Sequence, residues 1–345
     1  MRSLPLFAAL LLVFAALTGC GATADSSPSP AASGSAAPVA SAVPETANVT
    51  LIMDWVPWVL DIPVDVAVEK GYYAARGLTV KQIVPAGPTD VLKFVSTGKA
   101  QFGLYYAPDT LAGVEAGAPL VSVAGLMSHA PVGIAMAPGQ HATTPKDLAG
   151  KVVGVVLIPS TRASFQTMLT TGGVSSGAVK VADPGYEIVA PLLAGRYAGV
   201  AVTQFGELVQ AEQTGQTLDY LDFRDWGTPD FAFLNVVSQQ GFAGENPATV
   251  RAFVAATLAG LDYAARHPEE AVALYVKRHP ELKTELLLAQ WKAALPSMAT
   301  SGAQPAGWQD TRAWQKLDDW MVQTGQLKKA VDVSGATTNA YLPGQ

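Results

Sequence analysis

The stretch Asn48–Tyr73, NVTLIMDWVPWVLDIPVDVAVEKGYY, constrains the fold of this chain most strongly. Its start predicts a buried strand over Val49–Met53, because aliphatic and β-branched side chains favour sheets. The strand has to end at Asp54–Trp58 (DWVPW), since Pro57 lacks the amide hydrogen that a regular strand needs. A helix over Pro63–Lys70 is expected next. The stretch therefore delivers two indole rings and a carboxylate at the carboxyl end of a strand, where open α/β sheets bind ligands.

Short strands alternate with helices from residue 49 onward, which is the pattern of α/β lobes. At 345 residues the chain exceeds what one hydrophobic core usually organises, so two lobes are expected. A strand over Val132–Ala137 is expected to cross into the second lobe, and a strand over Phe231–Ser238 to return the chain. The predicted division is 48–136 and 238–345 in lobe 1 and 137–237 in lobe 2. Further strands are expected over 78–84, 101–105, 120–126, 152–156, 179–182, 199–203 and 218–223, and helices over 88–97, 109–116, 186–193, 248–266, 268–279, 283–295 and 309–324.

The first twenty residues, MRSLPLFAALLLVFAALTGC, predict a targeting segment. The apolar run Leu4–Leu17 is shorter than the ~20 residues of a membrane-spanning helix. The run ends in LTGC, which resembles a bacterial lipobox. Residues 1–20 are therefore expected to be a lipoprotein signal peptide, and Cys20 is expected to receive a lipid. An ordinary secretory peptide with an incidental cysteine is the alternative. Cys20 is the single cysteine of the chain, so no disulfide is expected.

Residues 21–47 are rich in Ser, Ala, Pro and Gly and contain almost no large side chains. Such a segment cannot bury enough apolar surface to offset the entropy of ordering it. It is expected to be a flexible tether. Lipid and tether together predict a globular part held at the extracytoplasmic face of the cell membrane, anchored to it without spanning it.

The composition argues against several classes of function. The net charge of −6 and the pI near 5.2 speak against nucleic acid as a partner. No GxGxxG, P-loop, GxSxG or HExxH motif is present, and the four histidines have no metal-ligand spacing. Thiol catalysis is excluded because Cys20 is the single cysteine. Neither a metal site nor an enzyme is therefore expected.

The strand ends are rich in aromatic side chains, with a few carboxylates, amides and hydroxyls among them. Aromatic faces stack on planar ligands, and polar groups bind the ligand's edges, so a site for a flat aromatic molecule is expected. Trp55 and Trp58 could also be core residues, since Trp is usually well buried. Ser160 or Thr161 is expected to cap the helix that ends at residue 171, and its start could offer amides to a ligand. The candidates for stacking are Trp55, Trp58, Tyr105 and Phe205, those for polar contact are Asp54, Asp61, Gln204 and Asp230, and further candidates are Tyr106, Ser160, Thr161 and Trp226.

From residue 49 to residue 326 the chain resembles the periplasmic binding proteins of the thiamine-pyrimidine type, which are related to alkylsulfonate-binding proteins. The resemblance implies the α/β, type II periplasmic-binding-protein fold, with two lobes around a ligand cleft joined by two crossings. It also implies a monomer that delivers a small molecule to an ABC transporter permease. The motifs that carry it are, in chain order, 54–57 (DWVP), 69–73 (EKGYY), 77–78 (GL), 98–102 (GKAQF), 145–151 (PKDLAGK), 227–231 (GTPDF) and 307–310 (GWQD).

The chain departs from this family's pattern at positions that bear on the identity of the ligand. Trp58 and Asp61 stand where the pyrimidine binders carry Asn and His, and Phe231–Phe233 stands where they often place a Glu. An added indole and a lost carboxylate imply a larger, more apolar ring system. The expected ligand is riboflavin, which similar proteins bind, and a thiamine pyrimidine precursor (formylaminopyrimidine or hydroxymethylpyrimidine) is the alternative.

Two other classes of function stay open at this point. Pyrimidine synthases of yeast belong to the same family, so an enzyme of that kind is a remote alternative, although no His lies near the first motif. A scaffold protein whose exposed aromatic side chains bind a protein partner is the third possibility.

Overall fold

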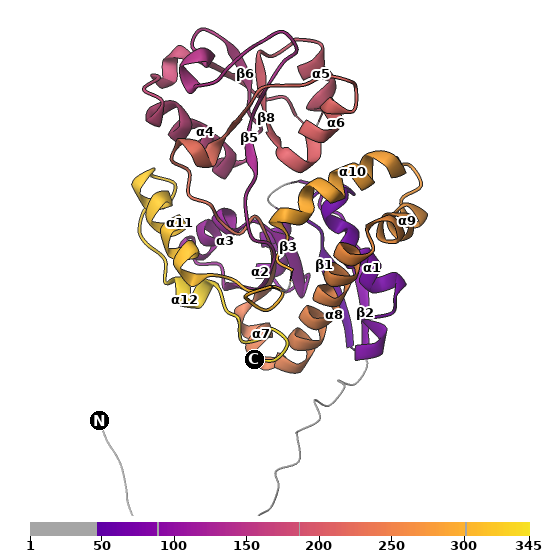
Figure 1. Ribbon diagram of the computed structural model, residues 1–345. Helices are drawn as coiled ribbons and strands as arrows, with labels where there is room; N and C mark the ends of the chain where they lie inside the picture. Colours follow the sequence, from indigo (N-terminus) through magenta and orange to yellow (C-terminus); the bar gives the residue numbers. More distant parts are fainter. Residues whose placement is uncertain (1–46, 88–89, 186, 301) are drawn as a thin grey trace, which may run out of the picture. The chain divides into compact units, whose positions relative to one another are not determined.

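The computed structural model describes residues 47–87, 90–185, 187–300 and 302–345, which lie in one compact unit. The expected signal peptide, Cys20 and nearly all of the expected tether lie outside the described residues. The described chain contains two five-stranded mixed sheets in two lobes (Figure 1). We call them the first and the second lobe.

The first sheet has the strand order β2-β1-β3-β10-β4. β1 lies between β2 and β3 and is parallel to both, whereas β10 runs antiparallel between β3 and β4, with Val236 opposite Leu104. The carboxyl ends of β1 and β3 therefore meet at one edge, as the sequence predicts for a ligand site. The strands are β1 (Ala47–Ile52), β2 (Leu78–Ile83), β3 (Phe102–Tyr105), β4 (Leu120–Met127) and β10 (Leu234–Gln239).

The second sheet has the strand order β7-β6-β8-β5-β9, with β5 antiparallel to β8. The chain changes sheets between β4 and β5 and returns between β9 and β10. The expected boundary at residue 136 is therefore wrong, because Val132–Met136 already pairs within the second sheet. The strands are β5 (Val132–Met136), β6 (Val152–Gly154), β7 (Lys180–Ala182), β8 (Gly199–Thr203) and β9 (Tyr220–Asp222).

Helices cover the first sheet, and α8 packs closely on α1. A Cβ atom at Gly260 would lie 2.1 Å from the Pro63 carbonyl oxygen, so only glycine allows this approach. Phe253 of α8 stacks on Phe102 of β3 with ring centroids 3.8 Å apart. The helices and turns of this lobe are η1 (Val59–Asp61), α1 (Ile62–Glu69), η2 (Ala74–Arg76), α2 (Asp90–Ser96), α3 (Ala107–Glu115), α7 (Gln240–Glu245), α8 (Pro247–Arg266), α9 (Pro268–Arg278), α10 (Thr284–Ala294), η7 (Leu295–Ser297), α11 (Thr311–Gln323) and α12 (Val333–Ala336).

The second lobe has shorter helices, and its sheet is buried on both faces by separate apolar clusters. A π-helical turn, η5, follows β8 directly. The remaining elements are η3 (Pro145–Leu148), α4 (Pro159–Thr171), η4 (Ser176–Ala178), α5 (Val189–Leu193), η5 (Gln204–Leu208), α6 (Val209–Glu212) and η6 (Phe223–Trp226).

The start of α4 differs from the expectation. The N-cap position is Ile158, and Pro159 takes the first helical position, so the predicted capping by Ser160 or Thr161 is wrong. Proline suits that position because its missing amide hydrogen is not needed there. Both hydroxyl residues consequently lie inside the first turn.

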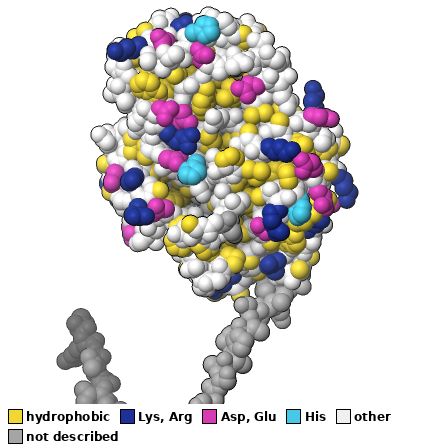
Figure 2. Space-filling model, viewed as in Figure 1, with side chains coloured by type: hydrophobic (Ala, Val, Ile, Leu, Met, Phe, Trp, Pro, Cys, Tyr) yellow, Lys and Arg dark blue, Asp and Glu magenta, His cyan; other side chains and the backbone are white. Residues whose placement is uncertain are grey.

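No helix in the described part of the chain is long and apolar enough to cross a membrane. On the face shown in Figure 2, basic side chains lie beside acidic ones without forming a continuous basic area.

Candidate ligand-binding site

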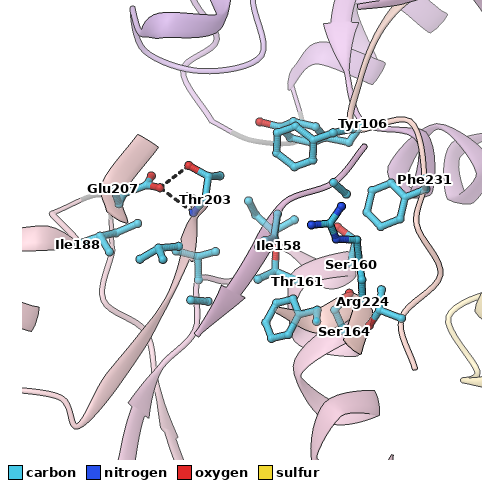
Figure 3. A pocket seen from close by; sticks show the side chains of 18 of the residues that line it. Tyr106, Ile158, Ser160, Thr161, Ser164, Ile188, Thr203, Glu207, Arg224 and Phe231 are labelled. Atoms are coloured by element: carbon cyan, nitrogen blue, oxygen red, sulfur yellow. Dashed lines mark hydrogen bonds between the residues drawn. The ribbon is translucent and has the colours of Figure 1, made fainter. Parts of the chain in front are cut away.

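A pocket with an empty volume of about 860 Å³, including space open to solvent, lies between the lobes (Figure 3). Its walls come from the loops after β1 and β3, from both crossings, and from β8, α4 and η6. Most lining groups are apolar or aromatic. The lining residues are Trp55, Trp58, Tyr106, Ala130, Val132, Val156, Ile158, Ser160, Thr161, Ser164, Ile188, Ala201, Val202, Thr203, Glu207, Phe223, Arg224, Thr228, Phe231 and Phe233.

Asp54 organises the wall that the first lobe contributes. Its carboxylate accepts hydrogen bonds from Trp58 Nε1 at 3.3 Å and from the Tyr106 hydroxyl at 2.9 Å. Asp54 itself is buried and does not line the pocket. Burial raises the pKa of Asp54 to about 6, although these two hydrogen bonds act to lower it. One carboxyl group thus orients an indole and a phenol that both face the ligand space.

The side chain of Asp61 holds the backbone of the same tryptophan. Oδ2 of Asp61 accepts from Trp58 N at 3.2 Å and from the Tyr275 hydroxyl at 3.3 Å. Burial, and then the negative charge of Asp54, raise the pKa of Asp61 well above its ordinary value. The two carboxyl groups therefore oppose each other's ionisation behind the pocket wall.

The π-helical turn η5 brings a carboxylate into the pocket from the second lobe. Oε2 of Glu207 accepts from Thr203 N at 2.8 Å and from Thr203 Oγ1 at 2.6 Å. Thr203 Oγ1 also accepts from Gly206 N at 3.1 Å, and a Cβ atom at Gly206 would lie 2.3 Å from this oxygen. The glycine is needed for the close turn that aims Glu207 at the ligand space.

Arg224 supplies a guanidinium to the pocket but is already paired. Its Nε and Nη2 donate to the two oxygens of Asp222 at 3.0 and 2.7 Å. Its Nη1 lies 3.8 Å from an oxygen of Asp230. Nearby, the buried Thr228 hydroxyl has no hydrogen-bond partner among the described residues. Because an unpaired buried hydroxyl is costly, Thr228 is a candidate contact for a bound ligand.

The first turn of α4 borders the pocket with Ser160, Thr161 and Ser164. Ser160 Oγ donates to Oδ2 of Asp109 at 3.3 Å, which links α4 of the second lobe to α3 of the first. Burial raises the pKa of Asp109 to about 6, although this hydrogen bond acts in the opposite direction.

Among the residues predicted from the sequence, the structure brings Trp55, Trp58, Tyr106, Ser160 and Thr161 to the pocket. All five are wholly or partly buried.

The other predicted residues do not line it. Asp54 and Asp61 lie behind Trp58, as described above. Phe205 is buried with the core cluster of the first lobe, its ring centroid 5.7 Å from that of Trp58. The remaining residues absent from the lining are the buried Tyr105, the exposed Gln204 and Asp230, and the half-buried Trp226.

Each of these four residues lies outside the pocket lining for a separate reason. Tyr105 precedes Tyr106, and neighbouring residues of an extended chain point to opposite sides. Trp226 packs against the apolar cluster of the second lobe. Asp230 instead accepts from Ala130 N at 3.1 Å, which joins the two crossings. Gln204 is exposed at the start of η5.

Sequence reasoning missed Glu207, Arg224, Thr228 and the two phenylalanines of the return crossing, Phe231 and Phe233. The sequence did contain a signal for Glu207. It lies one helical turn after the end of a strand, so its side chain can point back toward that strand end. Arg224 and Thr228 carried no comparable signal, since both follow the edge strand β9. No group of three or more His, Cys, Asp and Glu side chains among the described residues could hold a metal ion.

Comparison with known proteins finds relatives whose sequences align with most of this chain. A formylaminopyrimidine-binding protein of Halalkalibacterium halodurans is 26% identical over 80% of this chain and 87% of its own length. The riboflavin-binding protein RibY of Chloroflexus aurantiacus is 27% identical over 97% of this chain and 96% of its own. A relative from Legionella pneumophila, named 4-amino-5-hydroxymethyl-2-methylpyrimidine phosphate synthase, is 23% identical over 86% of this chain and 92% of its own.

The fold matches solved structures as well. The periplasmic aliphatic sulphonate binding protein SsuA of Escherichia coli superposes with a TM-score of 0.67 at 15% identity, covering 84% of this chain and 91% of SsuA. The chain therefore has the type II periplasmic-binding-protein fold that the sequence predicts. A family model described as NMT1/THI5 like matches residues 61–271. Because this match spans more than half of the 345 residues, the chain belongs to the NMT1/THI5-like family.

Proposed function

We propose that this protein is the substrate-binding protein of an ABC importer and captures a flat aromatic vitamin or vitamin precursor. The observation that carries the proposal is the pocket between the lobes, whose walls combine indole, phenol and phenyl rings from both. A planar ligand between such walls gains stacking of ~0.5–1.5 kcal/mol for each aromatic pair beyond burial of its area. It also favours the closed arrangement, because each lobe supplies part of the contacts.

Riboflavin is our first candidate ligand. Its three-ring system suits a pocket in which aliphatic side chains, among them Val156, Ile158 and Ile188, continue the aromatic wall. The similarity to RibY along nearly the whole chain supports the same choice.

A thiamine pyrimidine precursor is the second candidate, and Glu207 is the observation that favours it. Phe231–Phe233 carries no carboxylate where the family often places one, but Glu207 supplies a carboxylate from another element. Both hydrogen bonds from Thr203 go to Oε2, so Oε1 receives neither of them. A carboxylate oxygen is a suitable acceptor for the amino group of an aminopyrimidine.

The test begins with the absorbance spectrum of the purified protein, followed by calorimetric titration with riboflavin and with formylaminopyrimidine. A flavin spectrum, or binding of riboflavin in preference to the pyrimidine, is expected. Preferential binding of the pyrimidine would replace the first candidate with the second. Binding of neither compound, with no stabilisation across a panel of planar vitamins, would remove the proposal in favour of a scaffold protein.

We also propose that Cys20 carries a lipid and that residues 21–47 tether the binding lobes to the extracytoplasmic face of the membrane, beside the permease. The protein is proposed to act as a monomer and without catalysis. Conversion of any vitamin precursor by the purified protein in the presence of iron would favour the enzyme alternative instead.

A further inference from the structure

Among the described residues that line the pocket, no unpaired cation is left for a ligand. Arg224 is the single basic side chain among the described residues that line the pocket. Its guanidinium makes a two-bond pair with Asp222, and Asp230 lies 3.8 Å from its third nitrogen. The side chain of Asp222 is only 12% exposed, so water screens this pair weakly. The guanidinium therefore faces the carboxylate of Asp222, and more distantly that of Asp230, which also contacts His129 Nδ1, before any ligand arrives.

The first turn of α4 is the other source of positive potential, because the free amides of a helix start attract anions. The structure places a carboxyl group of the first lobe beside the side chain of Ser160 in this turn. Asp109, from the first lobe, accepts the hydrogen bond from Ser160 Oγ at 3.3 Å. The first turn of α4 thus already has a half-buried carboxyl group of the protein beside Ser160, and its negative charge opposes a ligand anion there.

Glu207 adds a negative charge at the other side of the pocket. Figure 3 shows Glu207 and Arg224 on opposite sides of the ligand space, with Ile158 between them. The hydrogen bonds to Glu207 come from neutral donors of Thr203, which hold the carboxylate in place without cancelling its charge. An anionic group on a ligand would meet an uncompensated carboxylate at one side and a neutralised guanidinium at the other.

We infer that the pocket selects uncharged ring systems and rejects the phosphorylated or sulfonated forms of the same molecules. This inference rests on the proposed function for its ligand class, but its charge argument concerns anions in general. A phosphate monoester carries about −1.5 to −2 charges at neutral pH, and burying it without a counter-charge is strongly unfavourable. The phosphorylated partner of any bound vitamin is expected to bind at least about a hundredfold more weakly.

Calorimetry with matched pairs tests the inference. The pairs are riboflavin with riboflavin 5′-phosphate, and hydroxymethylpyrimidine with its phosphate. Thermal unfolding with inorganic phosphate and with methanesulfonate forms a second arm that needs no vitamin. Uncharged members are expected to bind, and neither small anion is expected to stabilise the protein.

Variants locate the cause of the rejection. Asp222→Asn releases the guanidinium of Arg224 and is expected to reduce the preference for the uncharged form by about tenfold. Asp219→Asn is the matched control, because it removes one negative charge from the second lobe at a residue that pairs with His141 and does not line the pocket. The control is expected to leave the preference unchanged. Should Asp222→Asn not fold, Glu207→Gln tests the charge at the opposite side by the same measurement.

The outcomes separate the two claims. Equal or tighter binding of a phosphorylated form, or stabilisation by either small anion, would overturn the charge selection even if the vitamins bind. If no vitamin binds and neither anion stabilises the protein, the rejection of anions is supported, whereas the selection of uncharged ring systems and the proposed function both fail. A loss of preference in Asp219→Asn as large as in Asp222→Asn would also overturn the inference, because overall charge would then be the cause.

Discussion

Trp58 is the residue at which the two lobes and the ligand space meet. Asp54 holds its indole nitrogen and Asp61 its backbone amide, while Phe205 of the second lobe packs against its ring. A half-buried ring held at three points loses little freedom when a ligand stacks on it. Trp58 is therefore held in a fixed orientation at the pocket wall, as the proposed binding of a ligand requires.

Replacing this indole is expected to weaken ligand binding. Trp58→Ala removes a stacking face and leaves a hydrophobic surface uncovered, so affinity should fall at least about tenfold. Calorimetric titration measures the change. Trp226→Ala is the control, since Trp226 is also half-buried near the cleft but does not line the pocket. The site assignment would be contradicted if Trp226→Ala weakened binding and Trp58→Ala did not.

Asp109 gives a pH dependence of known sign. Burial raises its pKa from 3.8 to about 6, so the folded state binds the proton more tightly than the unfolded state does. Its contribution to the free energy of unfolding therefore increases as the pH falls through 6, and is smallest above that value. From pH 7 to pH 5 this contribution amounts to about 1 kcal/mol.

Urea unfolding at pH 7 and pH 5 measures this effect. Asp109→Asn is expected to gain less stability on acidification than the unaltered protein, by about 1 kcal/mol. Asp54, whose pKa burial also raises to about 6, contributes with the same sign and keeps part of the slope in the variant. Identical slopes in both proteins would show that Asp109 does not hold its proton more tightly when folded.

Among the elements, the turn η5 and helix α10 decide how the second lobe meets the first. Gln290 of α10 donates from Nε2 to the Gly206 carbonyl oxygen at 3.0 Å. Gly206 lies between Phe205, which packs on Trp58, and Glu207, which lines the pocket. α10 is itself joined to α8 through Trp291 Nε1 and the Ala264 carbonyl at 2.8 Å. The C-terminal helices thus position a turn of the opposite lobe.

Gln290→Ala is expected to weaken ligand binding by about two- to tenfold, because a hydrogen bond contributes ~0.5–1.5 kcal/mol and this one joins the lobes. Gln240→Ala is a matched control, since Gln240 Nε2 donates to the Gly335 carbonyl oxygen, also at 3.0 Å, within the first lobe. Calorimetry on both variants should show a loss for Gln290→Ala only. Equal losses would mean that general destabilisation, and not lobe closure, lowers the affinity.

The order and type of most elements followed from local patterns. The long helix α8 begins at Pro247, one residue before the expected start at residue 248, and the Asn246 side chain donates to the Phe242 carbonyl without capping the helix. The short helices α7 and α12 and the turn η5 were not predicted. Elements of four to six residues bury too few side chains to leave a readable period.

At the scale of the whole molecule, the two crossings make one binding site from two sheets. The return crossing supplies Phe231 and Phe233 to the pocket, and Asp230 joins it to the outgoing crossing through Ala130 N. Under the proposed capture, closure of the lobes would change the contacts of ligand and crossings together.

Cys20→Ser tests the proposed anchoring of this assembly to the membrane. The variant is expected in the soluble extracytoplasmic fraction, because one acyl-bearing residue would account for the attachment. Immunoblots of fractionated cells measure the distribution. A variant that stays with the membrane as fully as the original chain would contradict a lipid at Cys20.

The sequence by itself determined the α/β alternation and the delivery of Trp55, Trp58 and Tyr106 to strand ends that border the pocket, and its motifs implied the type II fold by resemblance. The alternation and the strand-end positions follow from side-chain period, proline and glycine positions and strand polarity, all of which act within a few residues. Only the tertiary structure decided that Asp54 and Asp61 lie behind the wall, that Glu207 enters the pocket, and that Arg224 is already neutralised. The direction of a side chain after a strand end depends on turn geometry and on contacts with the other lobe, which no local pattern in the sequence encodes.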